Sequence, residues 1–96
     1  MKTFYYLMGK YSNACIRDVD RLARYGATHV RLETELTNGY KTKDGRWDEK
    51  ATIAANKKRD RIDSKMEAIV SELGLRIEYG ALTVRIVFPD GREAAI

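Results

Sequence analysis

The chain has 96 residues and a formal net charge of +4, with 44% hydrophobic residues, 33% charged residues and one proline. This balance predicts one compact domain over residues 1–96 and excludes long disordered segments. No stretch approaches the roughly 18 apolar residues of a membrane span, so we expect no membrane partner, and the lone Cys15 favours a reducing, cytoplasmic location because it leaves no internal disulfide.

The first predicted elements are a strand, a helix and a second strand. Residues 3–8 form an apolar and aromatic run closed by Gly9, typical of a strand covered on both faces. Residues 14–25 carry apolar side chains at helical spacing, which predicts an amphipathic helix ended by Gly26. Residues 28–36 alternate between apolar and polar side chains, which predicts a strand with one solvent-facing side.

A long helix is the next strong prediction. The Asn38-Gly39 pair signals a hairpin, after which residues 40–43 would return as a short, polar edge strand. An apolar stripe over residues 48–73, with Asp48 as the cap, predicts a helix whose first half either overhangs the core or breaks near Asn56.

The chain closes with alternating segments. Residues 75–79 and 82–88 predict two strands, and the turn sequence Pro89-Asp90-Gly91 precedes a short last strand over 92–96. The predicted fold is therefore α+β, a mainly antiparallel sheet of four to five strands with two helices on one face, in the order β-α-β-(β)-α-β-β. Its first six elements match the ferredoxin-like order β-α-β-β-α-β, although residues 40–43 are too polar for the central strand of that topology.

Positive charge is concentrated in residues 41–61, which hold eight of the 18 bases and four of the 14 acids. A localised positive field attracts polyanions or an acidic protein surface. Lys57, Arg61 and Lys65 are spaced by four residues, and Lys50 precedes Lys57 by seven, so all four share one side of the predicted helix. The alternative is a solvated helix back without a partner.

Aromatic and basic residues interleave just before this helix. Tyr40 and Trp47 could stack on nucleic-acid bases while their basic neighbours meet phosphates, and the same composition suits a protein hot spot. Alternatively, Trp47 packs on the helix as a hydrophobic staple. The candidate binding residues are Tyr40, Lys41, Lys43, Arg46, Trp47, Lys50, Lys57, Lys58, Arg61 and Lys65.

The sequence contains few residues of the types that catalytic and metal sites need. His29, the single histidine, falls on the polar side of the predicted strand, which predicts a surface or paired residue. Cys15 falls on the apolar side of the predicted helix, which predicts a buried and inert thiol. Glu33 and Glu35 could hold Mg²⁺, but pairing with arginine explains them more simply. Zinc needs about four N or S ligands, which one histidine and one cysteine do not supply. We therefore expect no enzyme, no catalytic residues, no metal and no cofactor.

The expected function is binding. A small domain without a catalytic set would act by contact with a larger protein or complex, as a regulator or inhibitor; phage and mobile-element inhibitors, anti-CRISPR proteins among them, belong to this size class. The alternative is a nucleic-acid-binding protein that uses the basic helix and the aromatic loop. A protein partner is favoured over nucleic acid, and edge strands or the overhanging helix are compatible with a homodimer.

Overall fold

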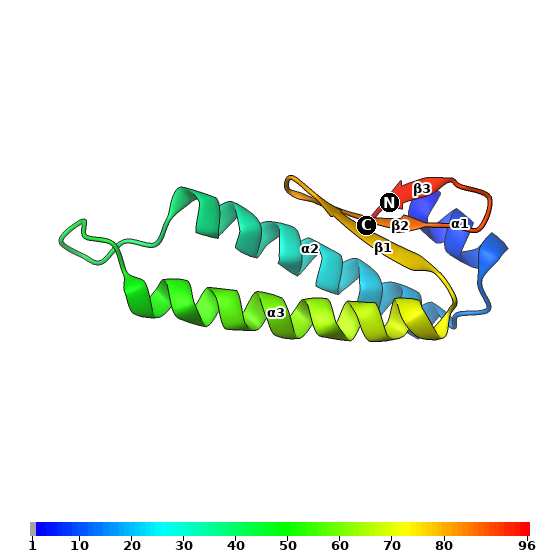
Figure 1. Cartoon of the computed structure of the whole chain (residues 1–96), viewed down its shortest axis with the longest axis horizontal. Helices are drawn as coiled ribbons and strands as arrows, with labels where there is room; N and C mark the ends of the chain where they lie inside the picture. Colours follow the sequence, from blue (N-terminus) through cyan, green and yellow to red (C-terminus); the bar gives the residue numbers. More distant parts are fainter. Residues whose placement is uncertain (1) are drawn as a thin grey trace.

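Three helices precede a small antiparallel sheet in the computed structural model, which describes residues 2–96 (Figure 1). The helices are α1 (Lys2–Tyr11), α2 (Ile16–Asn38) and α3 (Glu49–Glu72). The strands are β1 (Arg76–Gly80), β2 (Thr83–Val87) and β3 (Glu93–Ala95), and β2 lies between the other two. The described helices include none that is both long enough and apolar enough to cross a membrane.

Helices α2 and α3 form an extended antiparallel hairpin, and the rest of the molecule covers only one end of it (Figure 1). The sheet lies along the first half of α2 and the second half of α3, with α1 against β3. The connection between α2 and α3, residues 39–48, forms the opposite end and is here called the tip loop. The molecule therefore measures 51 × 19 × 18 Å.

The hydrophobic core lies at the covered end, where side chains from all three helices meet the sheet. Helix α1 buries three residues at the spacing i, i+3, i+4, and β2 buries alternate residues on its inner face. The largest fully buried side chains are Phe4, Met8, Leu22, Met66, Val70, Val84 and Ile86.

The strand predicted at residues 3–8 is wrong, because this segment belongs to α1. As a helix, the run turns Phe4, Leu7 and Met8 inward and leaves Tyr6 62% exposed. An apolar run of six residues fits a two-residue and a 3.6-residue period equally well.

The helix predicted at 14–25 and the strand predicted at 28–36 are one helix, α2. Its inward side chains continue at helical spacing through Leu22, Gly26, His29 and Leu32, all buried. Gly26 is therefore no helix stop. It lies inside the helix, where a Cβ atom would come within 2.6 Å of Cγ2 of Ile96.

Residues 40–43 form no strand; the structure has only an isolated bridge between Lys41 and Trp47. With two of its predicted strands helical and a third missing, the four- to five-stranded sheet with β-α-β order is wrong. The observed sheet is three-stranded and antiparallel, at the C-terminal end of the chain.

The predictions for the second half of the chain are confirmed for α3 and for the strands that follow it. The Asp48 carboxylate accepts a hydrogen bond from the Ala51 amide at 3.0 Å and caps α3. The helix is unbroken at Asn56, so its first half overhangs the core as an uncovered part of the hairpin.

Candidate nucleic-acid interface

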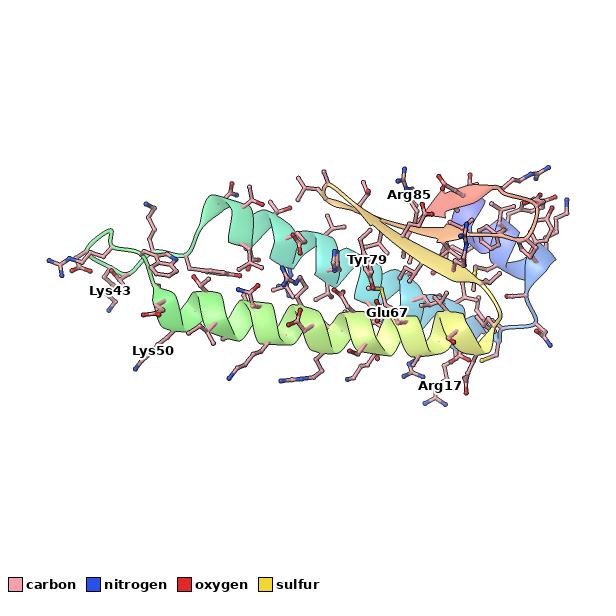
Figure 2. The ribbon with its side chains drawn as sticks, viewed as in Figure 1. Arg17, Lys43, Lys50, Glu67, Tyr79 and Arg85 are labelled. Carbon is pink, nitrogen blue, oxygen red and sulfur yellow. The ribbon has the colours of Figure 1, made fainter. Side chains whose placement is uncertain are left out.

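Helix α3 separates its charges onto two sides. Asp63 faces α2, with Oδ1 2.6 Å from Nδ1 of His29. Glu67 accepts a hydrogen bond from the Tyr79 hydroxyl of β1 at 3.1 Å, and Figure 2 shows the two side chains pointing toward one another. Lys65 is two residues from Asp63 and so projects about 200° away around the helix axis. Asp63 and Glu67 therefore face α2 and the sheet, whereas Lys65 faces away from the sheet, on the side that it shares with Glu72, seven residues further on.

Helix α2 adds a second row of bases. Arg17, Arg24 and Arg31 are exposed and follow one another at intervals of seven residues, close to two helical turns. Figure 2 shows Arg17 and Lys50 projecting to the same side of the hairpin, away from the sheet and near its two ends. One base of each helix, Arg17 of α2 and Lys50 of α3, is thus seen on this side of the molecule.

Tyr25 joins the two rows. The Arg21 guanidinium of α2 and the Lys65 ammonium of α3 each lie 5.9 Å from the centre of its ring. The Arg21 guanidinium, hydrogen-bonded to the phenol, lowers the pKa of Tyr25, and the charges of Lys65 and Arg24 act in the same direction. Three cations from two helices thus create a positive potential around one side chain.

We call this side of the hairpin the basic face. Figure 2 places Arg17 and Lys50 on this side, and the other members are the bases within about 80° of either of them around the same helix axis, which gives Arg17, Arg21, Arg24, Arg31, Lys50, Lys57, Lys58, Arg61 and Lys65. Within residues 2–96, Arg21 is the one member in an ion pair, with Asp18 at 3.6 Å. By contrast, Arg59 points to the other side and pairs with Glu33 at 2.9 Å. The other members of the basic face make no ion pair in the described residues, and the acids Asp20, Glu35 and Glu72 share the same sides of α2 and α3 at helical spacing.

The structure brings together all the predicted bases of α3 and adds arginines that the sequence reading missed. The sequence predicts a helix that ends at Gly26, with Arg17 and Arg24 on it, and a strand that carries Arg31. The three arginines could therefore not be recognised as one row on the same side of a single helix. The seven-residue spacing of these arginines was the available signal.

The predicted loop residues lie apart from this face, in the tip loop. Lys41, Lys43, Arg46 and Trp47 are exposed there. The Tyr40 hydroxyl donates to Glu35 of α2 at 2.7 Å, so Tyr40 is held against the hairpin. The backbones of Tyr40 and Trp47 are thus neighbours in the tip loop, but only the Trp47 side chain is exposed.

His29 and Asp63 form a histidine–carboxylate pair, a combination used in general-base catalysis. Only 6% of the His29 side chain is exposed, and the Tyr79 ring covers it at 5.1 Å between centres. A substrate has no access to the imidazole, so this pair joins α2 to α3 and is structural. Its histidine is buried in a helix, where the sequence predicted the polar side of a strand.

Two other candidate groups also differ from expectation. Cys15 is exposed at the start of α2, so its predicted burial is wrong. Glu33 and Glu35 are engaged by Arg59 and Tyr40, and no group of three or more potential metal ligands occurs in the part of the chain that the structure describes.

No family model, curated protein or solved structure matches this chain.

Proposed function

We propose that this protein binds nucleic acid through the basic face, as a binding protein without catalytic activity. The observation that supports the proposal is that bases of α2 and α3, most of them without an ion pair, meet around Tyr25 and on the side where Figure 2 shows Arg17 and Lys50. Phosphate contacts by lysine and arginine supply most of the affinity of sequence-tolerant nucleic-acid binding.

The dimensions of the basic face suit a phosphate backbone. Lys50 and Lys65 are 15 residues apart on one straight helix, about 22 Å at 1.5 Å per residue. Duplex DNA presents one phosphate charge per about 1.7 Å of axis, so about 13 charges pass along this length. The axes of two packed helices are about 10 Å apart, and each of the two helices carries a row of bases.

The shape of the hairpin favours contact with backbones over reading of base edges. Two helices side by side make a face about as wide as the molecule, which measures 19 × 18 Å across its long axis. The major groove of B-DNA is about 12 Å wide and admits a single helix. We therefore expect binding that tolerates sequence.

The test is fluorescence anisotropy with a labelled mixed-sequence duplex at several salt concentrations. With about five phosphate contacts, the slope of log K against log salt is about −4.5, which weakens binding about 500-fold between 50 and 200 mM salt. No binding at the lower salt concentration would contradict the proposal.

A charge-reversal variant tests the location of the site. In the triple variant Lys57→Glu, Arg61→Glu, Lys65→Glu, we expect the salt slope to shrink by about 2.7 and the affinity at 100 mM salt to fall at least about 100-fold. The matched control, Lys10→Glu, Arg76→Glu, Arg92→Glu, changes net charge equally at exposed positions off the basic face. If the control weakens binding as much, net charge and not the basic face is responsible.

Contact with a larger protein is the second candidate function, and exposed apolar residues at the tip end of the hairpin favour it. Trp47 is 63% exposed and Ile53 is 47% exposed, beside the bases of α3. Trp and Arg are the residue types that dominate protein hot spots. A chain that fails to bind any nucleic acid at low salt would leave regulation or inhibition by protein contact as the favoured function.

A further inference from the structure

Trp47 presents an unusual combination of exposure and fixed orientation. Its indole N–H donates to the Thr52 hydroxyl at 3.0 Å, and that hydroxyl donates to the Asp48 carbonyl at 2.9 Å. The edge of the ring is thus tied to the first turn of α3, while 63% of the residue remains exposed. Burial does not explain this ring, because within residues 2–96 it belongs to no part of the core.

The tip loop that carries Trp47 has its own backbone order. Lys41 and Trp47 form an antiparallel bridge, the Asp48 amide donates to the Tyr40 carbonyl at 2.8 Å, and the Thr42 amide donates to the Arg46 carbonyl at 2.7 Å. Gly45 closes the turn at φ 82°, a conformation that favours glycine. The tip loop is therefore an ordered, hydrogen-bonded loop that fixes the position of the Trp47 backbone.

The tip loop holds three bases and two acids, and its Arg46 is paired with Asp44 at 3.7 Å, which leaves the charges of Lys41 and Lys43 in excess. Lys41, Lys43 and Arg46 of the tip loop are exposed, and Figure 2 shows Lys43 on the loop and Lys50 just beyond it on α3. Lys50 also belongs to the basic face and is three residues from Trp47. Thr52, which holds the indole, is two residues from Lys50 and so projects about 200° away from it around α3, which makes Lys41 and Lys43 of the tip loop the bases that accompany the ring.

From this arrangement we infer that Trp47 stacks on an unpaired base, so that the protein prefers nucleic acid with a single-stranded segment to continuous duplex. The inference rests on the proposed function and adds the class of nucleic acid. Aromatic rings stack on bases of any sequence, whereas the bases inside a duplex are already stacked on one another. Only an unpaired base offers its face to the indole.

The fluorescence of Trp47 reports the stacking directly, because the chain has a single tryptophan. We expect oligothymidine to quench this fluorescence as it binds, and a long duplex with few ends to bind without quenching. Replacing Trp47 by alanine should weaken oligothymidine binding about 5- to 100-fold and leave duplex binding unchanged, with Trp47→Phe intermediate. Circular dichroism checks that each variant is folded.

Each contrary result has a distinct meaning. Oligothymidine that binds with unchanged fluorescence, and equally well to Trp47→Ala, would overturn the stacking and leave the proposed function standing. Equal losses for oligothymidine and duplex in Trp47→Ala would also overturn it, since they would make Trp47 a structural support. Binding to neither probe would overturn the proposed function as well and assign the tip loop to a protein partner.

Discussion

Gly26 shows how a single missing side chain sets the distance between α2 and the end of the sheet. A Cβ atom at this position would lie 2.6 Å from Cγ2 and 2.8 Å from Cβ of Ile96. Glycine inside a helix costs about 1 kcal/mol relative to alanine, whereas overpacking costs about 1–3 kcal/mol. Because Cβ of Ile96 moves only with its backbone, we expect Gly26→Ala to bring no gain and to lower the free energy of unfolding by up to about 2 kcal/mol, measured in urea.

The matched control removes the Ile96 side chain, which the new Cβ atom would contact. In the Ile96→Gly background, the new Cβ atom no longer meets the Ile96 side chain, so the helix preference dominates and Gly26→Ala should stabilise the protein by about 1 kcal/mol. A stabilising effect of Gly26→Ala in the parent chain would contradict the close approach of α2 and Ile96.

At the scale of elements, α2 and α3 are joined by the pair His29 and Asp63. Burial raises the pKa of Asp63 above its ordinary value of 3.8. The hydrogen bond from His29 and the charges of His29 and Arg59 lower this pKa, but by less than burial and the charge of Glu67 together raise it. The folded protein thus holds this proton more tightly than the unfolded chain does. The resulting stabilisation is complete below pH 3.8 and is lost as the pH rises through the folded pKa.

This linkage makes a prediction for Asp63→Asn, whose side chain does not titrate and still accepts a hydrogen bond from His29. The free energy of unfolding of the variant, relative to the parent chain, should increase as the pH rises through the window just above 3.8. Urea unfolding at a series of pH values measures it. Asp60→Asn, at an exposed position, is the control. If the free energy of unfolding of Asp63→Asn relative to the parent chain depends no more on pH than that of Asp60→Asn does, the raised pKa of Asp63 is contradicted.

The elements also show what sequence reasoning reaches. Residues 48–73 were predicted as a helix because their apolar stripe repeats over several turns, and the C-terminal strands because their alternation is bounded by turn residues. In α2, by contrast, Val30, Leu32 and Leu36 are spaced by even numbers and imitate a strand. The packing of this segment on α3 and the sheet shows that its apolar residues follow the 3.6-residue period of a helix. Once the segment is known to be helical, Arg31 can be placed on the basic face.

At the scale of the molecule, stability is distributed unevenly along the hairpin. The Cα radius of gyration is 15.2 Å, against about 12.5 Å for a compact chain of this length. Most of the buried side chains lie at the end covered by the sheet, while the uncovered end buries little beyond Leu32 and Ala55. We expect amide hydrogen exchange to slow steadily from the tip loop toward the sheet, because local opening needs least energy where few apolar contacts are lost. Uniform protection along α2 and α3 would contradict this gradient.

The positions of Cys15 and Trp47 give the hairpin a built-in molecular ruler. The chain has one cysteine and one tryptophan, and both are exposed. Cys15 precedes α2 and Trp47 lies in the tip loop, so the 23 residues of α2, which span about 34 Å, lie between the two ends of the hairpin that they mark. A dye attached to the Cys15 thiol would accept excitation energy from the Trp47 indole without any substitution in the chain. Bending or straightening of the hairpin on a ligand would then appear as a change in transfer efficiency.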